Sequence, residues 1–325
     1  NGATLGGRIF AAGLVGDDNA AKGLSGILQE KSVDVSGFIK DANRSTISKT
    51  RIVAGGRTTV SQQIVRVDKE SKEPMGKAQE QQLEEYLKQV LPQVKGVVLS
   101  DYGSGTITDK LLGQIFAYCQ EHNIPTIVDS RYDILRFKTV DYIKQNDAEL
   151  SAAIGRDLAT EEELVQGGCE LLVKMSAKGA LITRGEDGMS LFQIISPQEA
   201  ADYVKSQEAS GSVDAGQFRE GLAVKLVVKR HTGRLSVVQE LISYQDRDIL
   251  VSHIPVTDKS EVYDVSGAGD TCVATVILGL AAGLEPLLAC QLSNESSGIA
   301  VRKMGTSVVY AKELEARFRQ LGYEA

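Results

Sequence analysis

The residues with the clearest chemical potential lie in one short stretch, Asp264 to Thr271, which reads Asp-Val-Ser-Gly-Ala-Gly-Asp-Thr. Its small residues let the backbone approach a bound group closely, and glycine tolerates the positive φ values that an anion-cradling turn needs. An apolar run follows directly and stops at Gly283, which is typical of the residue after a helix C-terminus. The stretch therefore predicts a glycine-rich turn at the start of a buried helix, whose N-terminal N–H groups and positive dipole end face the turn.

Asp270 lies where this turn would hold a phosphate, and two roles fit it. A lone carboxylate repels a phosphate, so the residue can simply be a helix N-cap. Alternatively, it is a general base that takes a proton from a hydroxyl while the turn holds the transferring phosphoryl group. The sequence alone leaves both roles open.

The bulk properties exclude several other classes of protein. The net charge of −7 over 325 residues argues against a nucleic-acid surface, although a local anion site remains compatible with it. No apolar run reaches the about 18 residues that suggest a membrane span. The four cysteines are scattered, which is typical of buried thiols in a reducing cytosol. We therefore expect a cytoplasmic protein with a small-molecule substrate and with neither a nucleic-acid nor a membrane partner.

The order of the predicted elements favours an α/β fold. From residue 96 onward, short apolar strands alternate with helical patterns, which is the rhythm of a parallel sheet. Two of these strands end in Asp101 and Asp129, and catalytic groups in such sheets gather at the carboxyl ends of strands. Two earlier segments, 46–53 and 62–67, alternate polar and apolar residues and predict a half-exposed hairpin.

Two further motifs have both an ordinary and a functional interpretation. Asn146 and Glu149 are three residues apart at a predicted helix start, where they fit a capping box. Gly185 and Gly188 frame a Gly-x-x-Gly turn, which on its own is usually a hairpin turn. Phosphate-loop, dinucleotide, nucleophile-elbow and zinc motifs are all missing from the sequence.

Together these motifs resemble the ribokinase (PfkB) family of sugar kinases. The stretch Asp264–Thr271 is similar to the C-terminal signature of that family, in which the last Asp is the base and the preceding small residues form an anion hole. The resemblance covers most of the chain. It is nearest to the kinases of D-glycero-D-manno-heptose 7-phosphate, whose Asp-Tyr-Gly-x-Gly phrase is similar to Asp101–Gly105.

The resemblance implies a ribokinase-like three-layer α/β fold with a mostly parallel central sheet, helices on both faces and a small β lid. It implies one kinase domain over residues 1–325, with lid strands within 45–70. Residues 193–252 depart from the family pattern, because a loop at this place normally has about a dozen residues or fewer, and we predict that they form an inserted flap with some strand content. It also implies a further strand and a Gly-Gly-rich segment before Asn1, which matches the last Asn of that segment. The lid strands are expected to pair between two subunits of a homodimer.

The resemblance also implies a role for each matching residue. Asp270 is the expected base, and ATP, Mg²⁺ and a monovalent cation near Asp264 are the expected cofactors. The expected anion hole is Gly267, Ala268 and Gly269; the nucleotide residues are Asn146, Arg184, Gly185, Gly188, Asn294 and Gly298; the sugar residues are Lys49, Arg51, Gln63, Arg66, Asp68 and Asp101; the metal residues are Glu149 and Asn146.

We therefore predict an ATP-dependent kinase that phosphorylates a hydroxyl of a sugar or sugar phosphate similar to heptose 7-phosphate. Two departures from the family pattern leave the identity of the sugar open: Ser104 replaces a usual Lys, and Ser130-Arg131 replaces Pro-Lys. A further departure lies in the segment similar to the adenine side of the family, where 295–297 is more polar than usual. A hexose or nucleoside kinase of the same family is the first alternative. A nucleotide- or sugar-binding regulator without turnover is the second, and the lid pattern also fits an ordinary solvated hairpin.

Overall fold

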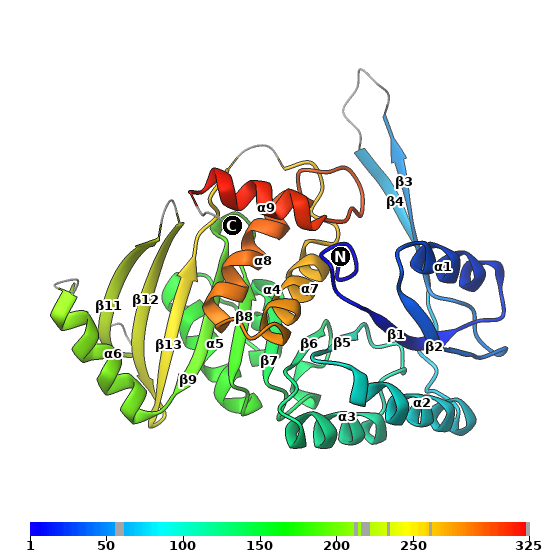
Figure 1. Ribbon diagram of the computed structural model, residues 1–325, viewed down its shortest axis with the longest axis horizontal. Helices are drawn as coiled ribbons and strands as arrows, with labels where there is room; N and C mark the ends of the chain where they lie inside the picture. Colours follow the sequence, from blue (N-terminus) through cyan, green and yellow to red (C-terminus); the bar gives the residue numbers. More distant parts are fainter. Residues whose placement is uncertain (56–61, 211–213, 216–221, 233–234, 260–261, 323–325) are drawn as a thin grey trace. The chain divides into compact units, whose positions relative to one another are not determined.

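The computed structural model describes residues 1–55, 62–210, 214–215, 222–232, 235–259 and 262–322 (Figure 1). The chain divides into two compact units, where the sequence predicted one domain over residues 1–325. The larger unit contains the predicted anion turn, and the smaller unit contains the predicted lid. The larger unit comprises Asn1–Gly7, Val94–Tyr102 and Cys119–Ala325, and the smaller unit comprises Arg8–Gln93 and Gly103–Tyr118.

Among the described residues, the larger unit is built on a nine-stranded mixed sheet in the order β10-β11-β12-β13-β9-β8-β7-β6-β5. The strands β5 to β8 are parallel, as the predicted βαβ rhythm requires, and the pairs from β8–β9 to β10–β11 are antiparallel. The strands are β5 (Val97–Asp101), β6 (Thr126–Ser130), β7 (Tyr142–Asn146), β8 (Gly179–Thr183), β9 (Met189–Ile195), β10 (Asp214–Ala215), β11 (Ala223–Thr232), β12 (Leu235–Tyr244) and β13 (Arg247–Ile254).

Helices cover both faces of this sheet, so the predicted three-layer α/β architecture is confirmed (Figure 1). Leu191 and Phe192 are neighbours on β9 and therefore point to opposite faces. The ring of Phe192 packs so closely under α5 that a Cβ at Gly168 would overlap it. Leu191 belongs to a buried cluster with Cys272 of α7 and Cys290 of α8. The helices are α4 (Asp147–Ile154), α5 (Glu161–Met175), α7 (Ala268–Ala281), α8 (Pro286–Ala300) and α9 (Ala311–Gln320).

The segment 193–252 is not the peripheral flap that the sequence predicted. Its strands β11 to β13 extend the sheet by backbone pairing with β9, and its helix α6 (Pro197–Ser210) packs against them. Leu226, Val228 and Leu241 are buried in a cluster that Tyr203 of α6 helps to cover. The error arose because strand pairing joins residues far apart in the sequence, which local polarity does not reveal.

The smaller unit contains a parallel strand pair with flanking helices. Its first helix begins after Asp18, whose carboxylate accepts hydrogen bonds from the Thr46 hydroxyl at 2.7 Å and from the Ala21 N–H at 2.9 Å. These bonds, with that of Thr46 the strongest cause, lower the pKa of Asp18 to about 2. The elements are β1 (Phe10–Val15), α1 (Asn19–Glu30), β2 (Asp34–Lys40), α2 (Lys77–Val90) and the first part of α3 (Asp109–Glu121).

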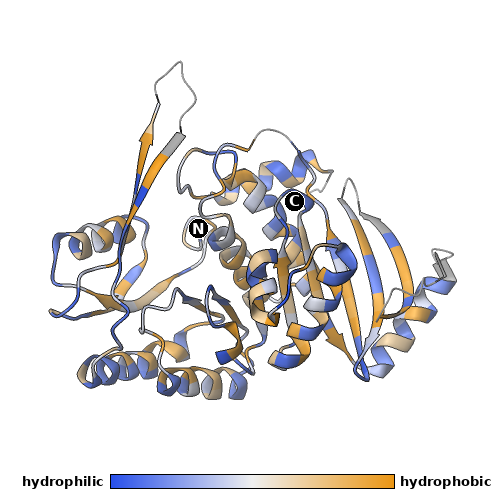
Figure 2. Ribbon diagram, turned by 180° about the vertical axis from the view of Figure 1, so that it is seen from behind, coloured by the Kyte–Doolittle hydropathy of each residue, from blue (hydrophilic) through white to orange (hydrophobic). Residues whose placement is uncertain are grey.

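The predicted lid over 45–70 forms a two-stranded antiparallel ribbon of β3 (Ser48–Ala54) and β4 (Gln62–Lys69). Within the described part of the chain, these two strands pair only with each other. Figure 2 shows hydrophobic residues along the ribbon, and many of their side chains are exposed. The exposed apolar residues are Ile52, Val53, Ile64, Val65 and Val67.

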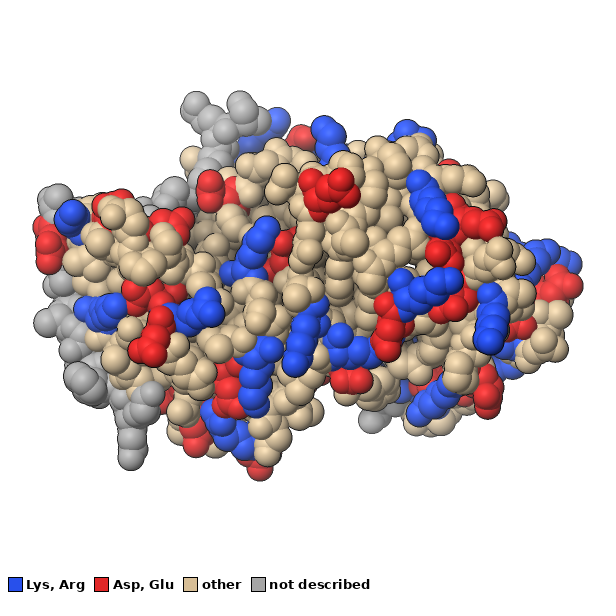
Figure 3. All heavy atoms as spheres, turned by 90° about the horizontal axis from the view of Figure 1, so that it is seen from below, with Lys and Arg blue, Asp and Glu red and all other residues tan. Residues whose placement is uncertain are grey.

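In the described residues, no helix combines the length and the apolar character that crossing a bilayer requires. On the face drawn in Figure 3, lysines and arginines are interspersed with aspartates and glutamates.

Candidate active site

The predicted anion turn forms at the start of α7. Gly267 is the N-cap of this helix and has a φ of 83°, in the left-handed region that favours glycine. The Ser266 N–H donates to the Asp264 carboxylate at 2.8 Å, and the Ala268 N–H donates to the Val265 carbonyl at 3.2 Å. The first N–H groups of a helix have no acceptor within the helix, so this turn presents donors at the positive end of α7. A monovalent cation near Asp264 stays a prediction.

Asp270 lies in the first turn of α7 and is exposed. The N-cap of this fully described turn is Gly267, and no side chain caps it, so the N-cap role considered for Asp270 is wrong. The Tyr102 hydroxyl donates to Oδ1 of Asp270 at 3.4 Å. Burial, and then the carboxylates of Asp270 and Asp129, raise the pKa of Tyr102 to about 12. Asp270 therefore accepts a hydrogen bond from Tyr102 and does not cap α7, and its role as a base stays a prediction.

A buried ion pair lies behind the turn, and the sequence analysis missed half of it. Lys144 Nζ is 3.1 Å from Asp129 Oδ2, and a Cβ added at Gly269 would lie 2.8 Å from the same Nζ. The ammonium therefore sits directly beside the anion turn. The available signal was a lysine in the middle of a short, otherwise uncharged strand, two residues before Asn146.

Electrostatics keep this lysine charged. Burial alone lowers the pKa of Lys144, but the carboxylates of Asp129 and Glu149 outweigh burial and raise it. Burial raises the pKa of Asp129, while the Lys144 charge opposes that shift. A buried positive charge thus lies beside the turn, and the Asp270 carboxylate lies in the first turn of the helix that follows.

Asn146 and Glu149 form the capping box of α4. The Glu149 N–H donates to Oδ1 of Asn146 at 2.7 Å, and Oε2 of Glu149 accepts from the Asn146 N–H at 2.9 Å. The ordinary interpretation of the motif is therefore realised. The capping box does not use Oε1 of Glu149. The charge of Glu149 also acts on Asp129 and Lys144. No group of three metal-ligating side chains occurs in the described ranges.

Asp101 ends β5 with a buried side chain, whose Oδ2 accepts a hydrogen bond from the Ser130 hydroxyl at 2.8 Å. The Asp101 carbonyl also accepts from the Arg131 N–H at 3.0 Å. Asp101 therefore joins the end of β5 to the end of β6 by hydrogen bonds. Its predicted contact with a sugar stays a prediction.

The Gly-x-x-Gly turn connects β8 to β9, as an ordinary hairpin would. A Cβ at Gly188 would overlap the Ile254 carbonyl, and the φ of this glycine is 85°, so packing alone requires glycine there. Gly185 also has a positive φ, of 55°, but open space around it. The Arg184 guanidinium pairs with Glu161 at 3.3 Å. The predicted nucleotide contacts of these residues stay predictions.

Asn294 and Gly298 lie on α8, where Asn294 is buried and donates its side-chain amide to the Pro255 carbonyl at 2.8 Å. Residues 295–297 are more polar than is usual in the resembled family, and the structure gives a reason for Glu295. Glu295 is buried and accepts a hydrogen bond from Arg317 of α9 at 2.8 Å and another from the Thr257 hydroxyl at 2.6 Å. This pairing stabilises the buried charge and anchors α9 on α8.

The predicted sugar residues of the lid are described within the smaller unit alone. Lys49 pairs with Glu70 at 3.2 Å, and Arg66 pairs with Asp68 at 2.9 Å. Arg51 lies directly opposite Arg66 in the β3–β4 register. Gln63 lies opposite Val53, and its side chain falls outside the described residues.

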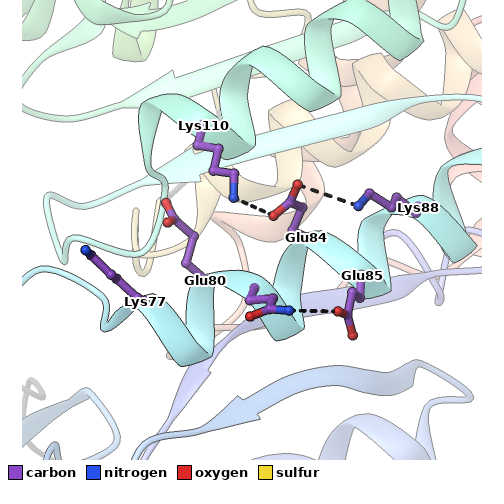
Figure 4. A pocket seen from close by; sticks show the side chains of 7 residues that line it. Lys77, Glu80, Glu84, Glu85, Lys88 and Lys110 are labelled. Carbon is purple, nitrogen blue, oxygen red and sulfur yellow. Dashed lines mark hydrogen bonds and ion pairs between the residues drawn. The ribbon is translucent and has the colours of Figure 1, made fainter.

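A separate hollow lies on α2 and α3 of the smaller unit (Figure 4). Three of its charged residues pair with one another, because Glu84 contacts Lys110 at 2.7 Å and Lys88 at 3.6 Å. The paired groups are those of a solvated helix surface, so the hollow is not assigned a function.

The structure therefore brings five groups together in the larger unit: the anion turn, Asp270, Tyr102, the Asp129–Lys144 pair and Glu149. A carboxylate beside a helix N-terminus and a fixed ammonium can accept a proton while a transferring phosphoryl group is held.

Residues 1–214 and 241–312 match the family described as pfkB family carbohydrate kinase. The intervening residues 215–240 include β11 and the first half of β12.

The relatives found by sequence are about twice as long as this chain. The bifunctional protein HldE of Geobacter metallireducens is 32% identical over 311 residues, which covers 95% of this chain and 51% of the relative. HldE of Hyphomonas neptunium is 32% identical over 324 residues, covering 99% of this chain and 54% of the relative. The chain thus spans about half the length of the curated relatives that it matches.

Solved structures with low sequence identity share the fold. Arabidopsis thaliana ribokinase complexed with ribose and ATP has a TM-score of 0.64 at 17% identity, covering 99% of this chain and 85% of the other. Escherichia coli phosphofructokinase-2 in complex with substrates and products has a TM-score of 0.64 at 18% identity with the same coverage. The predicted ribokinase-like fold is confirmed.

Proposed function

Since the chain belongs to the pfkB family of carbohydrate kinases, and is therefore a phosphotransferase with a sugar alcohol group as acceptor, we propose that its acceptor is heptose 7-phosphate or a close analogue. One observation carries the mechanism: Asp270 stands exposed in the first turn of α7, beside the anion turn and the buried Lys144 ammonium. The choice of sugar rests on the similarity of Asp101–Gly105 to the phrase of the heptose 7-phosphate kinases and on the relatives at 32% identity.

In the proposed reaction, Asp270 accepts the proton of the acceptor hydroxyl as its oxygen attacks the γ-phosphorus of ATP. A new oxygen–phosphorus bond forms, the bond between the γ-phosphorus and the bridging oxygen breaks, and ADP leaves. The N–H groups of Gly267, Ala268 and Gly269 and the Lys144 ammonium hold the negative charge of the transferring group. The Lys144 ammonium lies beside the turn already, whereas the Ala268 N–H has to leave the Val265 carbonyl to join the anion hole.

Glu149 and Asn146 are the residues that would hold Mg²⁺, mainly through water. One carboxylate suits this ion, because Mg²⁺ retains several waters and takes few protein ligands. Oε1 of Glu149 is not used in the capping box with Asn146 and fits such a role. When bound, Mg²⁺ neutralises phosphate charge; Asn146 meanwhile keeps Glu149 in position by accepting its N–H.

The proposal includes a homodimer, in which two copies of the chain pair their β3–β4 ribbons. Exposed apolar side chains on an isolated strand pair favour burial against another surface. Ile64 is 62% exposed and Val67 is 54% exposed, which is unusual for apolar side chains on a two-stranded ribbon that faces water. We also propose a cytoplasmic location. The four free cysteines, which are all buried, are compatible with a reducing compartment.

The test is an ADP-release assay with heptose 7-phosphate, fructose phosphates, ribose and nucleosides, with each phosphorylated product quantified. We expect the highest kcat/KM for heptose 7-phosphate. A higher value for a hexose phosphate, ribose or a nucleoside would replace the substrate assignment by that of another kinase of the family. ATP binding without product from any acceptor would instead favour a regulator without turnover.

A further inference from the structure

Tyr102 contacts the base although no part of the proposed transfer uses it. It directly follows β5, and its hydroxyl lies 3.4 Å from Oδ1 of Asp270. The side chain is 42% exposed, so its phenol lies at the surface of the site rather than in the core. Hydrogen bonds of catalytic groups are often long before substrate binds, and this distance is of that kind.

The direction of this hydrogen bond follows from charge. Burial and the nearby carboxylates raise the pKa of Tyr102 to about 12, so the phenol keeps its proton at neutral pH and donates it to Asp270. A general base receives the proton of the attacking hydroxyl at a carboxylate oxygen. The phenol of Tyr102 therefore occupies, at Oδ1, a position that an attacking hydroxyl could take.

Water is the competing hydroxyl. If water donated to Asp270, its oxygen could attack the γ-phosphorus, the bond to the bridging oxygen would break, and ADP and phosphate would leave with the proton on Asp270. Kinases must suppress this hydrolysis, and excluding water from the reacting groups is the usual means. A phenol on the base occupies that oxygen and so excludes water from it.

We propose that Tyr102 guards Asp270: its phenol holds Oδ1 until the acceptor hydroxyl displaces it, and it thereby suppresses transfer of the phosphoryl group to water. This inference rests on the proposed role of Asp270 as the base. The partial exposure of Tyr102 suits it, since an incoming sugar can displace a phenol at the surface of the site. Tyr102 is thus a positioning residue, because it acts through Asp270.

The test measures ADP release without any acceptor, with Mg²⁺ and ATP, for the wild type and for Tyr102→Phe. Phenylalanine keeps the ring and its packing and removes only the donor. We expect acceptor-free ADP release to rise about 3- to 10-fold, the net worth of one typical hydrogen bond, because this one is long and exposed to solvent. The KM for ATP should not change. The matched control is Tyr132→Phe, because Tyr132 is 65% exposed and lies against Arg131 instead of Asp270.

A second variant makes the result specific. In Tyr102→Phe/Asp270→Asn, the added hydrolysis should vanish, because water loses its base. Unchanged acceptor-free release in Tyr102→Phe would overturn the inference. An increase that persists in the double variant, or an equal increase in Tyr132→Phe, would also overturn it.

The assay separates this inference from the proposed function, since it needs no sugar. If no sugar is phosphorylated but Tyr102→Phe raises hydrolysis in an Asp270-dependent manner, the substrate assignment fails and the guarding role stands. If heptose 7-phosphate is phosphorylated and Tyr102→Phe leaves hydrolysis unchanged, only the guarding role fails.

Discussion

Asp129 and Lys144 are direct partners in the β6–β7 register, and their side chains form an ion pair of 3.1 Å beside the start of α7. Only 15% of the Asp129 side chain and 6% of the Lys144 side chain are exposed. Parallel strands place such partners on the same face of a sheet, so the register itself creates the pair. The ammonium contributes charge to the anion turn, and the carboxylate stabilises that ammonium in a buried position.

Replacing Lys144 with Met should destabilise the protein. The substitution leaves the Asp129 carboxylate buried without its partner, which costs about 3–5 kcal/mol in the free energy of unfolding. Urea unfolding at neutral pH measures this cost. The control is Lys174→Met, which removes an exposed lysine from Glu170 but leaves that carboxylate paired with Arg156, and which should cost less than about 1 kcal/mol.

The double variant Asp129→Asn/Lys144→Met completes this comparison. Removing both charges should recover part of the stability that Lys144→Met loses, because no charge then stays buried alone. A double variant less stable than Lys144→Met would contradict the ion pair as the cause.

Glu149→Gln should raise the Mg²⁺ concentration needed for half-maximal turnover. Glutamine still accepts the Asn146 N–H, so the capping box and the stability should be nearly unchanged. What the variant loses is the charge that Mg²⁺ prefers. A Mg²⁺ titration of turnover measures the effect.

The second capping box of the chain supplies the matched control. Glu163 accepts from the Thr160 N–H at 3.0 Å at the exposed start of α5, away from the anion turn. Glu163→Gln should leave the Mg²⁺ titration unaltered. Equal behaviour of the two variants would show that Glu149 only caps its helix.

The local parts of this structure could be predicted from the sequence. Gly267 takes a positive φ and α7 follows it, as the small residues and the apolar run indicated. The capping box at Asn146 also forms as its spacing predicted. In each case the determining contacts lie within four residues, so the sequence contains them directly.

The other parts depend on contacts between distant residues. The place of β11 to β13 in the sheet is set by pairing with β9, and the role of Lys144 is set by its register with Asp129. Tyr102 meets Asp270 across 168 positions of sequence. Such partners follow from topology, which a single sequence specifies only through the whole fold.

The extended sheet leads to a prediction about the segment 193–252. Leu241 of β12 is fully buried, so Leu241→Ala should cost about 2–5 kcal/mol in the free energy of unfolding, the usual cost of a cavity. The control, Leu288→Ala, removes a side chain that is 38% exposed and should cost clearly less. If urea unfolding shows equal and small losses of stability for the two variants, the segment 193–252 would be a peripheral flap after all.

Tyr102 also predicts a dependence of stability on pH. Its pKa in the folded protein, about 12, lies above the ordinary value of about 10 for an unfolded chain. The stability due to the protonated phenol is therefore fully present below about pH 10 and is lost as pH rises toward 12, because the unfolded state releases the proton first. The free energy of unfolding should fall less steeply over this range in Tyr102→Phe. Parallel curves for the variant and the wild type would be the contrary result.

Asp270→Asn tests the base. Asparagine keeps the size of the side chain and can still accept a hydrogen bond from Tyr102, but it removes the basic oxygen. Turnover should fall roughly 10²–10⁴-fold, the usual worth of a positioned acid–base group. ATP affinity should hold or rise slightly, because a negative charge near the γ-phosphate is gone. Thermal unfolding should change little, since Asp270 is exposed and does not cap α7.

The matched control for this variant is Asp109→Asn. Asp109 is also an exposed aspartate in the first turn of a helix, α3, so both variants lose the same small dipole contribution of about 0.3–1 kcal/mol. Only Asp270 lies beside the anion turn, so only Asp270→Asn should lose turnover. Single-turnover measurement of product with bound ATP separates the chemical step from binding. Wild-type turnover in Asp270→Asn would rule out proton acceptance by Asp270, and with it the phosphoryl transfer proposed for this site.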